Sequence, residues 1–230
     1  GPARWLMGNL NVVRLLYRLG LRSMHITHGE GGSESHFLQG TRSISGPCTP
    51  QDRVEQRKTF VGLTPFGFEC MKLQNEMGII VDTSHCNDKA WFDVMEVSET
   101  PPIMSHTAVF SLCNHYRCMT DDQIKALADR GGVMGIVVLP GFIDADPEKA
   151  TIDRIVDHIL YVRDMVGIDT VGFGSDYDGF SSPPVVPDVS QLVLLTQAMM
   201  ARGLTEEEIS KFWGGNLLRV FREVLDPHVG

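Results

Sequence analysis

Short apolar segments alternate with amphipathic segments along most of this chain. Each apolar segment is followed by a polar turn and then by a stretch in which apolar residues recur every three or four positions. This alternation is typical of parallel β/α architecture, because strands buried on both faces are apolar throughout and the helices that cover them are amphipathic. Five strands are predicted, over residues 21–27, 78–82, 102–104, 133–139 and 170–174.

Helices are predicted before, between and after these strands. In the first, residues 10–19, Leu10, Val13 and Leu16 recur at helical spacing, and Gly20 stands where a C-cap glycine belongs. The others are predicted over residues 66–77, 88–97, 121–130, 152–166, 190–202 and 206–225. Residues 29–64 are rich in Gly and Ser, and a long connection with a poorly ordered section is expected there.

Composition fits one folded domain over residues 1–230. The chain is 43% apolar and has no low-complexity run. Its formal charge of -9 disfavours nucleic acid or an anionic membrane surface as the main partner. No apolar run is long enough to span a membrane and no signal peptide is recognisable, while Gly1 and Pro2 resemble a tag-removal scar. The five cysteines contain no C-x-x-C pair, which favours a reducing, cytoplasmic compartment over a disulfide framework.

Four of the five predicted strands end near a side chain that binds metals or transfers protons. These side chains are His28, His85, His106 and Asp176. In a (β/α)₈ barrel, the carboxyl ends of the strands point side chains into one shared crater, where the chemistry takes place. Four such residues at equivalent positions therefore predict an active site.

His85 and His106 follow consecutive strands, so their imidazoles are expected to lie side by side although 21 residues separate them. Two neutral imidazoles and a carboxylate form a zinc site that leaves a position open for water. Asp176 is placed to take a proton from that water and pass it to a leaving amine. Asp178 is the competing carboxylate, but its position beside Gly179 is typical of a turn.

Several of these segments resemble, in order and at matching separations, the motifs of the membrane (renal) dipeptidase family of zinc-dependent peptidases. The resemblance extends from about Asn9 to Val224. The matching segments are residues 26–28 (ITH), 62–67 (GLTPFG), 78–85 (GIIVDTSH), 102–106 (PIMSH), 172–179 (GFGSDYDG) and 215–220 (GNLLRV). The resemblance implies a TIM (β/α)₈ barrel that hydrolyses dipeptides through a zinc-activated hydroxide between two zinc ions.

The same resemblance implies a role for each matching residue. His85 and His106 would be ligands of one of the two zinc ions, and Asp176 would be the acid/base. His28 would bind and polarise the scissile carbonyl, and Arg117 would clamp the carboxylate of the dipeptide. An arginine suits that role because its planar guanidinium holds a carboxylate through two parallel hydrogen bonds.

The chain departs from the family pattern in two respects. The family's first-strand His-x-Asp ligand pair and its bridging glutamate precede the helix equivalent to residues 11–19, and they have no counterpart here. The chain is therefore expected to form about five of the eight β/α units of a TIM barrel, with a C-terminal helix and without the N-terminal strands. It is expected to bind at most one zinc weakly, and to form a homodimer or associate with the missing N-terminal segment. Secondly, Leu139 stands where the family often has an aromatic residue.

Two alternatives remain open from the sequence. One is another amidohydrolase-type activity, such as a lactonase, because fold and metals do not fix the substrate. Arg117 discriminates against this reading, since a neutral ester needs no carboxylate clamp. The other is a catalytically inactive truncated barrel that acts as a binding or assembly subunit. His25, His115 and His158 are assigned structural or surface roles, and Asn216 is expected to tie the last helix to the barrel.

Overall fold

The computed structural model describes residues 6–28 and 38–228, and in it five short parallel strands form one sheet. The order of strands in the sheet follows the chain, β1-β2-β3-β4-β5. The strands are β1 (Ser23–His25), β2 (Ile80–Asp82), β3 (Ile103–Thr107), β4 (Val133–Ile136) and β5 (Val171–Phe173). The predicted α/β class is therefore confirmed, and β1 and β5 lie at the two edges of the sheet.

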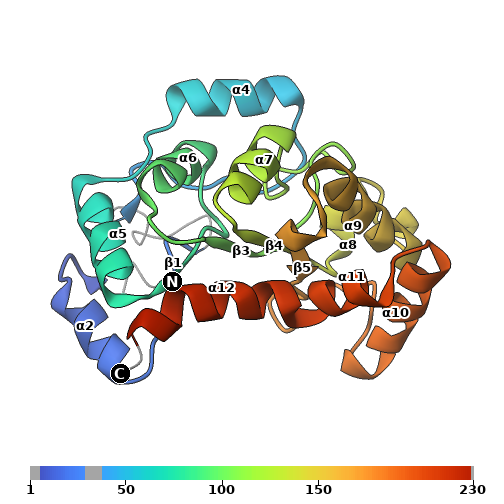
Figure 1. Ribbon diagram of the computed structural model, residues 1–230. Helices are drawn as coiled ribbons and strands as arrows, with labels where there is room; N and C mark the ends of the chain where they lie inside the picture. Colours follow the sequence, from blue (N-terminus) through green and yellow to red (C-terminus); the bar gives the residue numbers. More distant parts are fainter. Residues whose placement is uncertain (1–5, 29–37, 229–230) are drawn as a thin grey trace.

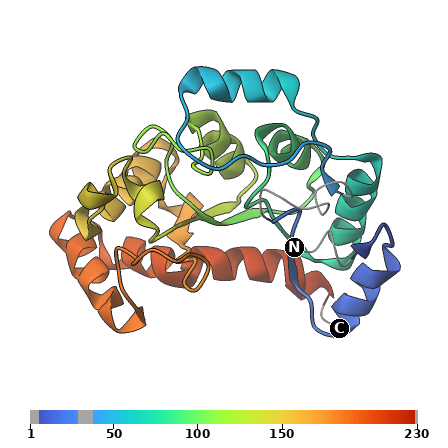
Figure 2. The same ribbon diagram turned by 180° about the vertical axis from the view of Figure 1, so that it is seen from behind.

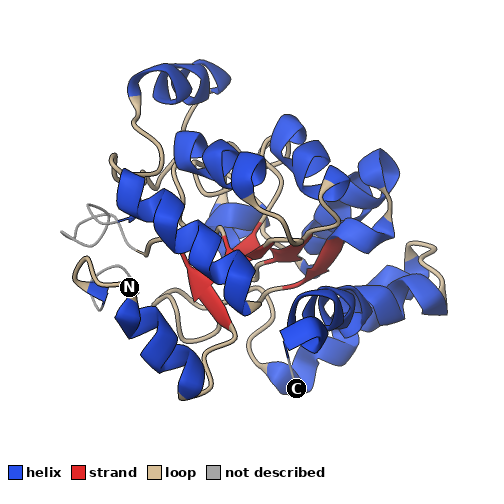
Figure 3. Cartoon of the chain, turned by 60° about the vertical axis from the view of Figure 1, so that its left-hand side comes forward, coloured by secondary structure: helices blue, strands red, loops and turns tan. Residues whose placement is uncertain are grey.

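Helices surround this sheet. They are α2 (Asn11–Arg18), α4 (Pro50–Thr59), α5 (Pro65–Met77), α6 (Asp88–Val97), α7 (Asp121–Asp129), α8 (Pro140–Ile143), α9 (Ile152–Val166), α10 (Leu192–Ala201), α11 (Glu206–Ser210) and α12 (Asn216–Leu225). Helices α5, α6, α7 and α9 lie on one side of the strands and α12 runs along the other, as two opposite views show (Figures 1 and 2). Figure 3 shows the strands enclosed between helices. None of the helices described in residues 6–28 and 38–228 is long and apolar enough to cross a membrane.

Helix α12 packs across the amino ends of the strands. Ile80, Ile103 and Val133, the first residues of β2, β3 and β4, form an apolar cluster with Val220 and Val224 of α12. This cluster is separate from the main core, which the helices on the other side of the sheet share. The amino ends of β2, β3 and β4 are thus held by apolar packing on α12.

Polar side chains of α12 complete this end of the sheet. Asn216 Nδ2 donates hydrogen bonds to the carbonyl oxygens of Ile168 (2.6 Å) and Val171 (2.8 Å). Arg219 donates to the carbonyl oxygens of Gly131 and Asp169, which precede β4 and β5. Asn216 therefore ties the last helix to the barrel, as expected from the sequence.

The connection predicted over residues 29–64 contains a helix that the sequence analysis missed. Residues 29–37 lie outside the described residues, but α4 occupies Pro50–Thr59. Thr49 caps this helix through a reciprocal capping box with Asp52, and Pro50 occupies its first turn. The helix is strongly polar and buries Arg53 and Gln56, so it lacks the apolar periodicity by which the other helices are recognised.

The last predicted helix, residues 206–225, is not continuous. A π-helical turn, Lys211–Gly215, separates α11 from α12. The wider turn lets two successive aromatic residues reach the same partner, because the Phe212 and Trp213 rings lie 6.2 and 5.0 Å from the Phe173 ring of β5. Trp213 also donates a hydrogen bond from Nε1 to Thr196 Oγ1 of α10.

Candidate functional site

The carboxyl ends of β1, β2 and β3 bring four histidines together. His25 ends β1, His28 follows it, His85 comes after β2, and His106 lies within β3, which extends further than predicted. Ring centroids are 4.4 Å apart for His28 and His85, and 5.0 Å apart for His85 and His106. His25 lies 6.1 Å from His85 and 6.0 Å from His106. The structure thus clusters three of the predicted site residues, and it adds His25, to which the sequence analysis gives no site role.

Two of these histidines point the same ring nitrogen at one another. The Nε2 atoms of His85 and His106 are 3.0 Å apart. Two imidazole nitrogens that face each other at this separation suit two ligands of one zinc ion, each about 2.0–2.1 Å from the metal. Among the described residues, no group of three or more His, Cys, Asp or Glu side chains has the arrangement of a complete metal site. The donor set therefore fits part of a metal site.

Both histidines are neutral in the folded chain. Burial, and then the charge of Arg117, lower the pKa of His85 to about 2 and that of His106 to about 4. A metal ligand must present an unprotonated nitrogen, so these shifts favour binding of a metal over binding of protons. His85 also adopts a left-handed backbone conformation, with φ at 67°, which is uncommon for residues other than glycine and is often found at functional sites.

Arg117 defines which nitrogen of His106 carries the proton. Its Nη2 lies 2.9 Å from His106 Nε2, and the side chain is almost entirely buried. Because a guanidinium only donates hydrogen bonds, His106 Nε2 is the acceptor. The proton of His106 is then on Nδ1, which lies 2.9 Å from Ser105 Oγ. The Nε2 lone pair of His106 consequently points towards Arg117 Nη2, and His85 Nε2 lies 3.0 Å from the same nitrogen.

A buried carboxylate holds the strand ends beneath these histidines. Asp82 Oδ1 accepts hydrogen bonds from the backbone N–H groups of Ser84 (3.0 Å) and Ser105 (3.1 Å), and Oδ2 lies 2.9 Å from His25 Nε2. Burial alone would raise the pKa of Asp82, yet His25 and these donors hold it well below its usual range. A charged Asp82 therefore links β1, β2 and β3 beside the histidine cluster.

Asp176 lies within the electrostatic influence of Arg117 and of two histidines of the cluster. Burial raises its pKa, while Arg117, His28 and His25 each oppose that shift. Its φ is 57°, and its carbonyl oxygen accepts a hydrogen bond from the N–H of Gly179. A side chain at Gly179 would place its Cβ 2.2 Å from Asp176 Oδ1, so the glycine gives the carboxylate its space.

Asp178, the competing carboxylate, lies elsewhere. It lines a separate hollow together with Tyr177 and residues 187–189. Asp176 itself lies within the electrostatic influence of Arg117 and His28.

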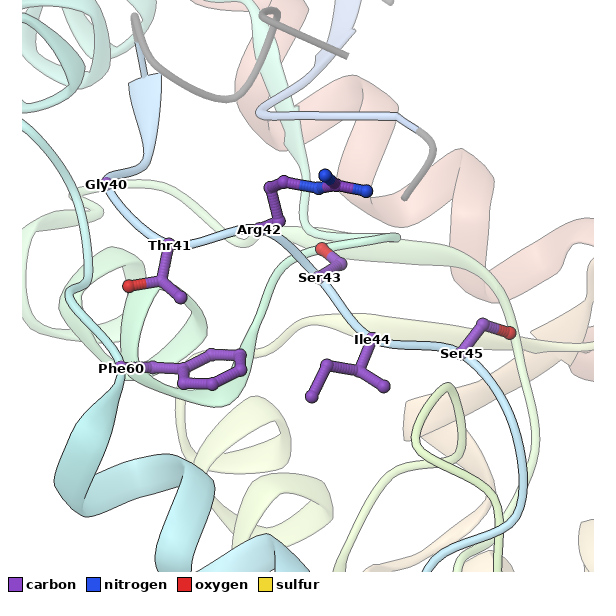
Figure 4. A pocket seen from close by; sticks show the side chains of 7 residues that line it. All are labelled: Gly40, Thr41, Arg42, Ser43, Ile44, Ser45 and Phe60. Carbon is purple, nitrogen blue, oxygen red and sulfur yellow. The ribbon is translucent and has the colours of Figure 1, made fainter. Parts of the chain in front are cut away.

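A cavity of about 690 Å³ adjoins the Arg117 side of the cluster. Its lining includes Leu139, Phe142 and His115. Phe142 connects the cavity to the site, because its ring stacks on His115 at 4.4 Å and underlies the Arg117 guanidinium at 5.6 Å. A second hollow, of about 460 Å³, is lined by residues 40–45 and Phe60 and by none of the predicted site residues (Figure 4).

Comparison with known proteins places the chain in a peptidase family. The family model described as membrane dipeptidase, peptidase family M19, matches residues 3–227. Dipeptidase tcpJ of Claviceps purpurea (strain 20.1) is 34% identical over 222 residues, which are 96% of this chain and 49% of that relative. The chain thus spans about half the length of this curated relative.

Solved structures share the fold. A metallo peptidase from Rhodobacter sphaeroides, liganded with a phosphinate mimic of the dipeptide L-Ala-D-Ala, is 26% identical, with a TM-score of 0.82 over 94% of this chain and 60% of its own. The probable dipeptidase PvdM from Pseudomonas aeruginosa is 23% identical, with a TM-score of 0.78 over 96% of this chain and 67% of its own, a likeness of fold alone. The five β/α units therefore correspond to part of a TIM-like barrel.

Proposed function

The chain belongs to the membrane dipeptidase family, peptidase family M19, and we propose from that premise that it contributes residues to the active site of a zinc-dependent dipeptidase. The observation that carries the proposal is the meeting of three groups at His106. His85 Nε2 and Arg117 Nη2 lie 3.0 and 2.9 Å from His106 Nε2. A neutral imidazole pair suited to a metal thus adjoins a buried guanidinium suited to a carboxylate, as a peptidase for dipeptides requires.

His85 and His106 would hold the metal, and imidazole nitrogens are common zinc ligands. When bound there, the metal would supply Lewis-acid chemistry, polarising the peptide carbonyl and lowering the pKa of a water. Two imidazoles fall short of the usual three protein ligands of a catalytic zinc. We therefore expect this chain alone to bind at most one zinc, weakly, and the remaining ligands to come from a longer form of the protein or from a partner chain. Two tightly held zinc ions per lone chain, measured by metal analysis, would contradict this.

The other site residues would bind substrate and move protons. Arg117 would hold the substrate carboxylate through paired hydrogen bonds from its guanidinium. Partial burial and neighbouring positive charges lower the pKa of His28, so a neutral ring could donate a hydrogen bond to the scissile carbonyl oxygen. Asp176, whose pKa is raised, would accept a proton on its carboxylate and return it to the departing amine.

The substrate class is tested by comparing a dipeptide with its C-terminal amide. In the complete active unit, Arg117→Met should raise KM for the free dipeptide by about tenfold or more and change KM for the amide little, because only the former has a carboxylate to bind. Arg163→Met is the matched control, since Arg163 pairs with Asp164 on the surface of α9. Equal cleavage of amide and free dipeptide by the unmutated unit would instead favour a lactonase or a general amidohydrolase.

A further inference from the structure

A buried arginine of α4 has an acceptor for every N–H group that it carries. Arg53 is only 3% exposed. Its Nε and Nη2 lie 3.0 and 2.8 Å from the two carboxylate oxygens of Asp88, and Nη2 also donates to Gln123 Oε1 at 2.9 Å. Its Nη1 donates to two backbone carbonyl oxygens, those of Tyr116 (2.6 Å) and Cys118 (3.1 Å). All five donors of the guanidinium are therefore used.

The two carbonyls that Arg53 binds stand on either side of Arg117. The carbonyl of Arg117 itself accepts a hydrogen bond from Thr107 Oγ1 at 2.9 Å, so three successive carbonyls are held by side chains. The segment before α4 adds backbone bonds to the same loop, from Cys48 N–H to the Asn114 carbonyl and from Tyr116 N–H to the Gly46 carbonyl. Hydrogen bonds from α4 and from the segment before it thus hold the backbone on both sides of Arg117, whose side chain extends towards His106.

We infer that Arg53 is a positioning residue for Arg117: by holding the carbonyls of Tyr116 and Cys118, it directs the Arg117 guanidinium into the site beside His106. Lysine cannot replace it there, because a single ammonium nitrogen cannot reach two carbonyls and a carboxylate in the fixed geometry of the planar fork. The positioning of Arg117 by Arg53 does not depend on the proposed function. Its expected consequence, tighter binding of a substrate carboxylate, rests on that function.

Arg57 offers a matched control on the same helix. It lies one turn after Arg53, and its Nε donates to Asp88 Oδ2 at 3.0 Å, the oxygen that also accepts from Arg53 Nε. Its other hydrogen bonds go to Thr120 Oγ1 and to the Asp122 carboxylate. If Arg53 served only to attach α4 to α6, then Arg53→Lys and Arg57→Lys would have similar effects.

Amide hydrogen exchange, measured by mass spectrometry, tests the positioning without any need for activity. The quantity measured is the ratio of the exchange rate in residues 108–119 to the exchange rate in β4. A general loss of stability would raise both rates and leave this ratio unchanged. We expect Arg53→Lys to raise this ratio by about tenfold or more and Arg57→Lys to change it by less than about twofold. Similar ratios for the two variants would overturn the inference. If Arg53→Lys does not fold, Gln123→Ala, which removes one acceptor of the same guanidinium, should raise the ratio to a smaller extent, and an unchanged ratio would overturn the inference.

Kinetics of the complete active unit test the consequence. Arg53→Lys should raise KM for a free dipeptide by about tenfold, with kcat and the KM for the amide changed less than about twofold. If Arg117→Met raises KM for the free dipeptide and Arg53→Lys does not, the inference is overturned. If Arg117→Met itself leaves that KM unchanged, the carboxylate clamp of the proposed function fails, and the exchange ratio alone decides the role of Arg53.

Discussion

The two ends of the strands in this sheet are held by different kinds of contact. At the amino ends, the aliphatic side chains of β2, β3 and β4 pack on α12, and the Asn216 amide donates hydrogen bonds to two backbone carbonyl oxygens. At the carboxyl ends, Asp82 contacts the histidine cluster, in which burial lowers the pKa of His85 to about 2 and that of His106 to about 4. The amino ends are held by aliphatic packing and backbone hydrogen bonds, and the carboxyl ends concentrate ionisable side chains.

This difference separates the residues that stabilise the sheet from those that carry the chemistry, as is general for (β/α)₈ barrels. A substitution at the amino ends should then change the free energy of unfolding and leave metal and substrate binding unaltered. A substitution of a proposed site residue at the carboxyl ends should instead change catalysis, metal binding or substrate binding. Four experiments test the comparison, in order of decreasing effect.

The largest effect is expected from Asp176→Asn in the complete active unit. Loss of the proton-transferring carboxylate should lower kcat by about 10² to 10⁴ while the metal content stays the same. Steady-state kinetics and metal analysis of the same preparation measure both. His106→Ala should instead lose metal. If Asp178→Asn abolishes activity and Asp176→Asn keeps it, the choice between the two carboxylates is wrong.

Acid should weaken the carboxyl end through His158, which bonds to the Val109 N–H and the Ile143 carbonyl, just beyond β3 and β4. Burial lowers its pKa from 6.5 to about 4. Between these values the unfolded chain binds the proton and the folded chain does not, so the stabilisation present above pH 6.5 is lost as the pH falls towards 4. The loss should be about 3 kcal/mol.

Urea unfolding at pH 7 and pH 4 measures this loss. His158→Gln keeps one donor and one acceptor but does not titrate, so it should remove this share of the pH dependence. His85, His106 and His115 shift in the same direction and remain in both proteins. Val224→Ala, at the amino end, should lower stability without altering its pH dependence. An unchanged pH dependence in His158→Gln would show that the titrating groups lie elsewhere.

Asn216→Ala should destabilise the chain without affecting its site. Two buried carbonyls would lose their donor, at a cost of about 2 kcal/mol in the free energy of unfolding. Leu218→Ala is the control on the same helix, because Leu218 is 51% exposed and should contribute little. Chemical denaturation gives the stability, and zinc titration should show no change. Weaker zinc binding in Asn216→Ala would break the proposed separation of the two ends.

The smallest effect concerns zinc affinity. Arg117 donates to the nitrogen of His106 that would bind the metal, and its positive charge repels a cation nearby. Arg117→Met should therefore tighten zinc binding by about tenfold, about 1.4 kcal/mol. Competition with a chromophoric chelator measures the affinity, with Arg163→Met as the control. Weaker binding would indicate that Arg117 supports the metal ligands and does not compete for them.

Much of the fold follows from local pattern. Each strand lies in or at the end of a short apolar segment bounded by polar turns, so all five could be predicted in order, although their ends could not. The extension of β3 to Thr107 depends on its pairing with β4, where Thr107 lies opposite Ile136. The break between α11 and α12 had a local signal that was not used, because the chain leaves the helical conformation at Gly214, the first of two successive glycines.

The candidate site divides in the same way. His85 and His106 could be singled out because each follows a predicted strand. Asp82 carried a signal that was not used, a carboxylate at the end of a fully buried strand. Arg53 carried almost none, since its partners Tyr116 and Cys118 are more than 60 residues away in the chain. Contacts of that range are set by tertiary structure, not by local sequence.

The order of the strands bears on how the chain folds. Each strand pairs with the one just before it, so most strands can join an edge that has already formed. The exception is the first pair, since Ser23 and Ile80 are further apart in sequence than the paired residues of any other neighbouring strands. Closing that longer loop costs more chain entropy, and slow closure of distant contacts delays folding. We therefore expect β2 and β3, whose paired residues are closest in sequence, to gain amide protection first and β1 last in pulse-labelling experiments, so that the histidine cluster would be completed only in the final step.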